Sequence, residues 1–189
     1  MRELVVISGK GGTGKTSLTA SFAVLAERPV IVDCDVDAAD LHLLLAPKVK
    51  ERHEFRSGRK AAIRQQDCSG CGTCLDVCRF AAVQKTTRED GTATYAIDLI
   101  ACEGCGGCVR FCPERAIDFS ESLSGEWMVS DTRCGPMVHA RLGIAAENSG
   151  KLVSTVRSEA RRIAEEEKRS LIIVDGPPGI GCPVIASLT

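Results

Sequence analysis

The sequence predicts an α/β fold with a mostly parallel sheet, interrupted by a small insertion that is rich in cysteine. Two apolar runs of the buried type, at residues 5–7 and 30–32, flank a helical segment, which is the pattern of a parallel βαβ unit. Residues 48–118 then change character, because Arg, Lys, Gly and Cys dominate. After residue 118 the chain returns to a long amphipathic segment and a third apolar run, at residues 171–174.

We therefore expect residues 1–47 and 119–189 to form one α/β domain, into which residues 48–118 are inserted. Helices are expected at 17–26 and 149–169, and a further strand at 126–130. Within the insertion, Ser57-Gly58 and Asp90-Gly91 predict hairpin turns. A doubly wound sheet normally contains more strands than these stretches supply, so we expect the α/β domain to be incomplete at its C-terminus.

Composition excludes some classes of partner. The chain of 189 residues has a formal net charge of −1, which favours neither nucleic acid nor an anionic membrane surface. Its apolar stretches are shorter than a membrane span. The apolar N-terminal run leads directly into a glycine loop without a cleavage site, so we interpret it as a strand and expect a cytoplasmic protein.

A phosphate-binding loop is predicted between the first strand and the first helix. The loop fits G-x-x-x-x-G-K-[ST], and it stands in the strand-to-helix context that this P-loop motif requires. Backbone N–H groups of such a loop surround phosphate oxygens, and the helix N-terminus adds partial positive charge. The alternative is a glycine-rich turn without a ligand. The predicted nucleotide-binding residues are Gly9, Lys10, Gly11, Gly12, Thr13, Gly14, Lys15, Thr16 and Ser17.

Lys15 is expected to reach the β- and γ-phosphates of ATP, and the Thr16 hydroxyl to bind Mg²⁺. Asp175 ends the apolar run 171–174, where a Walker B aspartate holds Mg²⁺. The sequence thus predicts a P-loop NTPase fold that binds MgATP through Lys15, Thr16 and Asp175.

The second lysine of the loop, Lys10, marks a deviant Walker motif, and the sequence resembles the superfamily of MinD, ParA and the nitrogenase iron protein. Residues 32–37 look like that superfamily's second acidic motif. The resemblance implies a Mg²⁺-dependent ATPase that forms a homodimer or pairs with a paralogous ATPase. It also implies that Lys10 reaches the partner's nucleotide and that Asp35 positions or activates water. The alternative for these aspartates is a solvated loop.

Eight of the eleven cysteines form a repeat with an offset of 34 residues. The pattern C-x₂-C-x₂-C-x₃-C occurs twice and is that of bacterial-type ferredoxins with two [4Fe–4S] clusters. The fourth cysteine of each run ligates the other cluster, so we expect two crossed sets of ligands. Zinc is the alternative, but zinc sites seldom use four cysteines in such a run. The predicted sets are Cys68, Cys71, Cys74 and Cys112 for one cluster, and Cys102, Cys105, Cys108 and Cys78 for the other.

Taken together, the chain is similar to MinD-superfamily ATPases that carry an inserted ferredoxin domain. This resemblance implies that MgATP is coupled to electron transfer through the two clusters, toward a redox partner protein. Two alternatives stay open: an ATP-dependent iron–sulfur cluster carrier of the Mrp type, and a passive ferredoxin on an ATPase scaffold. The eight ferredoxin-type cysteines count against the carrier, and Cys182, seven residues after Asp175, is the one residue that would support it, whereas Cys134 has no assigned role.

Overall fold

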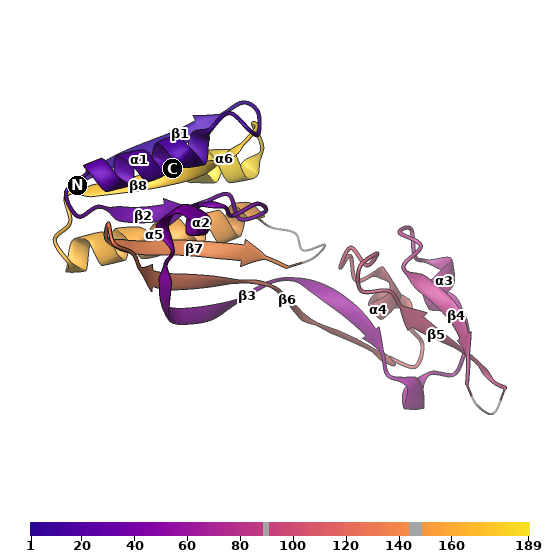
Figure 1. Ribbon diagram of the computed structural model, residues 1–189. Helices are drawn as coiled ribbons and strands as arrows, with labels where there is room; N and C mark the ends of the chain where they lie inside the picture. The colour runs from indigo at the N-terminus through magenta and orange to yellow at the C-terminus, as the bar shows by residue number, and fades with distance from the viewer. Residues whose placement is uncertain (89–90, 144–148) are drawn as a thin grey trace. The chain divides into compact units, whose positions relative to one another are not determined.

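The computed structural model describes residues 1–88, 91–143 and 149–189 (Figure 1). The chain divides into two compact units, one formed by residues 1–55 with 123–189 and the other by residues 56–122. Two long strands, β3 (Lys48–Ile63) and β6 (Ile117–Asp131), each contribute residues to both units.

The first unit is built on a mixed sheet in the order β1-β8-β2-β7-β6-β3. Its other strands are β1 (Arg2–Ser8), β2 (Val30–Asp33), β7 (Pro136–Leu142) and β8 (Leu171–Pro178). The pairs β1–β8, β8–β2 and β2–β7 are parallel, whereas β6 runs antiparallel to β7. The prediction of an α/β fold with a mostly parallel sheet is confirmed.

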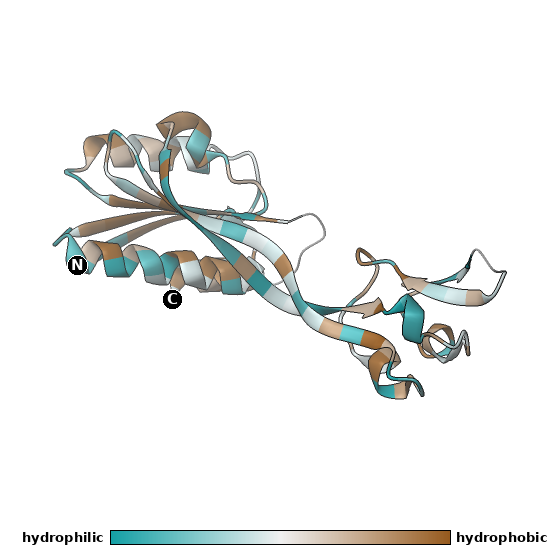
Figure 2. Ribbon diagram, turned by 90° about the horizontal axis from the view of Figure 1, so that it is seen from below, coloured by the Kyte–Doolittle hydropathy of each residue, from teal (hydrophilic) through white to brown (hydrophobic). Residues whose placement is uncertain are grey.

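Helices cover both faces of this sheet, as Figure 1 shows for α1 (Lys15–Leu25) and α5 (Ser149–Glu166). Successive side chains of a strand point to opposite faces. Ile31 of β2 therefore packs with α1 and α2 (Leu41–Leu45), while Val30 and Val32 pack with α5. The central strands are accordingly apolar along their length (Figure 2).

The apolar run 5–7 is less buried than its composition predicts. It lies in β1, which pairs only with β8 among the described residues and forms an edge of the sheet. Ile7 is 47% exposed, and Val5 is only partly buried. Apolarity alone does not distinguish an edge strand from a central one, because the number of neighbouring strands is set by topology.

Helix α5 ends three residues earlier than the sequence predicts. Lys168 adopts a left-handed φ of 54°, and the Arg169 N–H donates to the Ala164 carbonyl. This is the hydrogen bond of a Schellman C-cap, which satisfies a carbonyl that the helix leaves free. Glycine is the usual residue at that left-handed position, so the sequence, which has a lysine there, does not indicate the end of the helix.

The second unit combines the end of β3 (residues 56–63) and the start of β6 (residues 117–122) with a hairpin and short helices. Strands β4 (Val83–Thr87) and β5 (Ala93–Ile97) pair antiparallel around the predicted turn at Asp90-Gly91, of which Asp90 lies outside the described residues. The helices are the 3₁₀ turn η1 (Gln65–Asp67), α3 (Thr73–Asp76) and α4 (Gly107–Phe111). The predicted turn at Ser57-Gly58 is wrong, because both residues lie inside β3, where Gly58 has a left-handed φ of 68°.

The packing of α5 on the sheet yields a stability prediction. Leu152 is fully buried between α5 and the strands, so Leu152→Ala should lower the free energy of unfolding by about 2–5 kcal/mol through lost burial and a residual cavity. Leu25→Ala, at a side chain that is 82% exposed, should change it by less than about 0.5 kcal/mol. Urea unfolding followed by circular dichroism measures both, and equal effects would contradict this packing.

Candidate functional site

A cavity lies over the loop that joins β1 to α1 in the first unit. Gly14 is the N-cap of α1 with φ 82°, a left-handed conformation that glycine adopts without steric cost. The loop therefore turns back on itself and opens directly into the helix N-terminus. The cavity measures about 570 Å³, and its lining residues include Gly11, Gly12, Thr13, Gly14, Lys15, Thr16, Ser17, Asp35 and Asp37.

Acidic side chains meet Lys15 at the carboxyl ends of the parallel strands. Asp33 of β2 lies beside Asp175 of β8 in the register of the sheet. The Lys15 Nζ is 2.9 Å from Asp175 Oδ1 and 3.7 Å from Asp35 Oδ2. Lys15 and Asp175 are nearly inaccessible, with side chains 7% and 1% exposed, so water screens this pair weakly.

One oxygen of Asp175 has no protein partner. Oδ1 accepts from Lys15 Nζ and from Thr19 Oγ1, whereas the buried Oδ2 makes no hydrogen bond within the described part of the chain. A buried carboxylate oxygen normally has a partner, so a free one points to a ligand. Its place beside the phosphate-type loop fits Mg²⁺ or a water molecule bound to Mg²⁺.

The surroundings of Asp33 and Asp35 favour cations. Burial, followed by the charge of Asp175, raises the pKa of Asp33 to about 8. Burial also raises the pKa of Asp35, against the opposing influence of Lys15. The Asp35 and Asp175 carboxyl groups thus share one ammonium group, and an additional cation would relieve the repulsion among the clustered acidic groups.

The predicted residues of the acidic motif have separate positions. Asp33 accepts hydrogen bonds from the backbone N–H groups of Asp35 and Leu41, so it anchors the loop that follows β2. Asp35 lines the cavity beside Lys15. Lys10 is exposed, and its carbonyl accepts a hydrogen bond from Ser8 Oγ.

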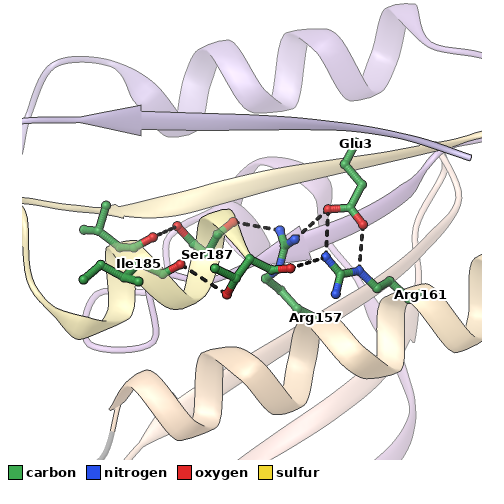
Figure 3. Close-up of polar contacts among 7 residues, drawn as sticks. Glu3, Arg157, Arg161, Ile185 and Ser187 are labelled. Carbon is green, nitrogen blue, oxygen red and sulfur yellow. Dashed lines mark hydrogen bonds and ion pairs between the residues drawn. The ribbon is translucent and has the colours of Figure 1, made fainter.

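A buried arginine of α5 holds helix α6 (Cys182–Leu188), which lies beside the cavity over the β1–α1 loop. Residues 177, 178 and 183 line the cavity just before and within α6. Arg157 donates to Glu3 Oε2 of β1 at 2.6 Å and to the Ser187 carbonyl of α6 at 2.7 Å, as Figure 3 shows. Arg161 also donates to Glu3, and together the two arginines lower the pKa of Glu3 despite its partial burial. This network fixes the C-terminal end of α6 against α5 and β1.

The eight predicted cluster ligands line two separate cavities in the second unit. The four thiols of each set lie on one cavity, including the cysteine that comes from the other run. The lining of the first cavity includes Cys68, Cys71, Cys74 and Cys112. The lining of the second includes Cys78, Cys102, Cys105 and Cys108. Four soft sulfur donors around a cavity fit a [4Fe–4S] cluster.

The 34-residue repeat relates the two cavities to one another. Adding 34 to Cys68, Gly72 and Cys74 yields Cys102, Gly106 and Cys108, which line the second cavity at matching positions. Apolar residues follow the same rule, because Ile63 in the first cavity corresponds to Ile97 in the second. The sequence repeat is therefore a repeat of structure.

Two glycines of the repeat allow the backbone to wrap around these cavities. Gly70 and Gly104 have φ values of 74° and 62°. A Cβ at Gly70 would lie 2.4 Å from the Ala93 carbonyl oxygen, and one at Gly104 would lie 2.2 Å from that of Arg59. A side chain at either position would push the loop away from its neighbouring strand.

Hydrogen-bond donors surround several of the sulfurs. The Ala116 N–H donates to Cys112 Sγ at 3.4 Å. Burial acts to raise the pKa of Cys78, but backbone hydrogen bonds from the following turn outweigh it and lower that pKa. Burial dominates at Cys74 and raises its pKa to about 11. Donors aimed at sulfur stabilise a thiolate, which is the form that binds iron.

The three remaining cysteines lie in the first unit, apart from these sets. Cys34 is buried in the core, and burial strongly raises its thiol pKa. Cys134 is partly buried in the turn between β6 and β7. Cys182 is exposed at the start of α6. Thr19, Lys60 and Arg88 belong to no sequence motif, and only their contacts in the folded chain connect them to the two sites.

The comparisons with known proteins bear on the second unit most directly. A model of the 4Fe-4S dicluster domain matches residues 53–117. Residues 53–117 form a 4Fe–4S dicluster ferredoxin domain. This domain accounts for the eight cysteines in two crossed sets.

Two curated proteins are similar to parts or most of the chain. An uncharacterized protein of the archaeon Methanocaldococcus jannaschii is 35% identical over 189 residues, covering 98% of this chain and 63% of the relative. The chain thus spans less than two thirds of that relative's length. A putative septum site-determining protein MinD of Oltmannsiellopsis viridis is 52% identical over 48 residues, covering 23% of this chain and 15% of that protein. No solved structure matches the chain.

Within the described ranges, no helix is both long enough and apolar enough to span a membrane.

The raised pKa of Asp33 predicts a pH dependence of stability. Between the ordinary aspartate pKa of 3.8 and the folded pKa of about 8, folded Asp33 keeps a proton that the unfolded chain has lost, so its contribution to stability decreases as the pH rises through this window. Asp33→Asn cannot ionise, and its free energy of unfolding should rise relative to the parent by up to about 1.4 kcal/mol per pH unit. Urea titrations from pH 4 to 8 without Mg²⁺ or nucleotide measure this, with the exposed Asp37→Asn as control. A pH-independent difference between Asp33→Asn and the parent would contradict it.

Proposed function

We propose that this protein binds and hydrolyses MgATP and couples it to electron transfer through two [4Fe–4S] clusters. The observation that carries the proposal is the free, buried Asp175 Oδ2, which lies beside Lys15 at a glycine loop in the same chain as the two cysteine-lined cavities. A carboxylate oxygen without a partner at the end of a parallel strand is suited to a magnesium ion.

The first unit is proposed to be a P-loop NTPase domain of the deviant Walker type. The loop lines the cavity and leads into the N-terminus of α1, and such a loop and helix N-terminus bind phosphate oxygens through backbone N–H groups. Lys15 would transfer its ion pair from Asp175 to the β- and γ-phosphates, and Asp175 would then hold Mg²⁺ together with Thr16. The short MinD match is in keeping with this assignment.

Asp35 is the proposed residue that orients the attacking water. It lies on the cavity wall 3.7 Å from Lys15, so it is close to where the terminal phosphate would bind. Lys10 is exposed, as a residue that reaches a second nucleotide site must be. We propose on this basis a dimer, formed with a second copy or with a paralogous ATPase.

The second unit is proposed to hold both clusters and to exchange electrons with a redox partner protein. When bound, the clusters supply one-electron storage at low potential. This chain's own part is to supply thiolates, direct N–H groups at sulfur, and limit the access of water. Cys74 and Cys102 are buried, whereas Cys71 and Cys105 are exposed and leave each site one open side.

A continuous strand offers the mechanical link between the two functions. The Leu142 N–H donates to the Val36 carbonyl, which lies between the acidic residues Asp35 and Asp37. The next residue, Gly143, donates to the Ser124 carbonyl of β6. Strand β6 continues to Ile117, which lines the first cysteine cavity. A shift of the acidic loop on nucleotide binding would therefore pull on a strand that ends at a cluster site.

The cluster carrier of the Mrp type is the second candidate. Cys182 favours it, because this thiol is exposed beside Pro183, which lines the nucleotide cavity. A carrier binds a labile cluster between two subunits, so Cys182→Ser would abolish transfer of a cluster to an apo-ferredoxin while leaving the eight ferredoxin ligands loaded. Unchanged transfer in Cys182→Ser would favour the electron-transfer function.

The coupling predicts a nucleotide-dependent spectrum. The anaerobically purified protein, reduced with dithionite, should contain about eight irons per chain and show interacting [4Fe–4S]⁺ signals. MgATP should change these signals or the rate of reduction. Thr16→Ala removes a proposed Mg²⁺ ligand and should weaken MgATP binding on the order of 10- to 100-fold, since a hydrogen bond or contact to a charged group contributes about 1.5–3 kcal/mol.

Ser21→Ala, on the exposed side of α1, is the matched control and should behave as the parent. Electron paramagnetic resonance with and without MgATP, together with isothermal titration calorimetry, measures both effects. Clusters that ignore saturating MgATP would instead support a passive ferredoxin.

The crossed ligand sets predict a pattern of iron loss. Cys112→Ser and Cys68→Ser remove ligands of the same cavity, so each variant, and the double variant, should retain about four irons per chain. Cys68→Ser combined with Cys78→Ser damages both cavities and should lose nearly all iron. Cys134→Ser is the control and should retain the full content. Iron and sulfide analysis measures this series, and greater loss in the Cys68→Ser, Cys112→Ser double variant than in the single variants would contradict the crossed sets.

A further inference from the structure

In each cysteine run, the backbone carbonyl of the first cysteine accepts a hydrogen bond from a cationic side chain. Lys60 Nζ donates to the Cys102 carbonyl at 2.5 Å. Arg88 Nη2 donates to the Cys68 carbonyl at 2.6 Å and also to the Gln65 carbonyl. Cys68 and Cys102 are equivalent in the 34-residue repeat, so the two cations serve corresponding points of the two sites.

The repeat itself does not supply these cations. The residue equivalent to Lys60 is Thr94, which donates to the Gln65 side chain at 2.6 Å. Cys68, the residue equivalent to Cys102, accepts a hydrogen bond from Arg88 instead, and Arg88 follows β4. A positive charge thus arrives at corresponding carbonyls from unrelated elements, Lys60 in β3 and Arg88 after β4. A hydrogen bond alone could come from a neutral side chain, so the charge is the feature to be explained.

The charge lies where it can act on a cluster. Both side chains are partly buried, so their charge is screened less than that of a surface residue. Reduction adds one negative charge at the site, and a fixed positive charge nearby stabilises the reduced state relative to the oxidised one. Charge and hydrogen bonds around a cluster set its reduction potential.

We propose that Lys60 and Arg88 each raise the reduction potential of one cluster: Lys60 at the site of Cys102, and Arg88 at the site of Cys68. The inference rests on the proposed function in that both clusters are bound by the two sets of cysteines. It assigns the two residues as electrostatic tuning residues that touch ligand backbone and not the clusters.

Single-cluster backgrounds make the assignment testable in the full chain. Cys112→Ser leaves the site near Lys60 intact, and Cys78→Ser leaves the site near Arg88 intact. In the Cys112→Ser background, Lys60→Gln should shift the midpoint potential to more negative values, whereas Arg88→Gln should leave it nearly in place. In the Cys78→Ser background, Arg88→Gln should shift the midpoint potential to more negative values, whereas Lys60→Gln should leave it nearly in place. Redox titration with mediators, followed by electron paramagnetic resonance, measures each midpoint.

Charge is separated from structure by conservative variants. Lys60→Arg and Arg88→Lys keep the charge and should keep the parent midpoint. Lys85→Gln removes an exposed charge from β4 in the same unit and should cause a much smaller shift than Lys60→Gln. The proposal is overturned if Lys60→Gln and Lys85→Gln shift the midpoint equally, or if Lys60→Arg shifts it as far as Lys60→Gln.

Iron and sulfide analysis of every variant distinguishes failure of the tuning role from failure of the proposed function. Full cluster content with unmoved midpoints overturns the tuning role and leaves the proposed function standing. Loss of iron in Lys60→Gln beyond its Cys112→Ser parent overturns the tuning role as well, because Lys60 would then be required for assembly. A parent chain without iron overturns both this inference and the proposed function.

Discussion

The first unit depends on a buried ion pair at the end of a parallel sheet. Lys15 and Asp175 come from α1 and β8, and they meet because the carboxyl ends of parallel strands share one edge of the sheet. Each is buried, so each needs the other, and removing either charge would leave its partner without compensation. Asp35 adds further negative charge at the same edge, whereas Asp33, whose pKa is raised to about 8 by burial, adds a carboxyl group that is mostly protonated at neutral pH. The arrangement holds the glycine loop, α1 and the acidic loop together, and it leaves one Asp175 oxygen available.

A different constraint governs the second unit, where the backbone must wrap closely around two cavities. The repeat solves this twice with the same means: glycines where a Cβ would strike a neighbouring strand, and N–H groups directed at sulfur. Because the last cysteine of each run lines the cavity of the other, neither half can form its site alone. The two halves differ mainly in what surrounds the ligands, and Lys60 and Arg88 are the charged part of that difference.

Strands β3 and β6 carry the chain from one unit to the other. Both β3 and β6 contribute residues to the sheet and to the ferredoxin domain. Val36 joins the acidic loop to this system twice, through its carbonyl bond to Leu142 and through a core cluster shared with Phe55 of β3. Under the proposed function, a movement of the acidic loop on nucleotide binding would reach β3 and β6 through these two contacts of Val36.

The sequence by itself determined the elements whose physics is local: the βαβ pattern, the strand–glycine loop–helix order, and the repeated cysteine spacing, which also predicted that Cys112 and Cys78 cross over. It did not reveal that β1 is an edge strand or that Ser57-Gly58 lies within a strand, since each depends on neighbours far along the chain. It also missed the end of α5, because a lysine occupies the left-handed position that glycine usually marks. Only tertiary structure brought Asp175 to Lys15, 160 residues apart, and Lys60 to Cys102, 42 residues apart. Neither an ion pair between distant residues nor a hydrogen bond from a cation to a distant carbonyl leaves a periodic signal in the sequence, because both are set by how the strands assemble.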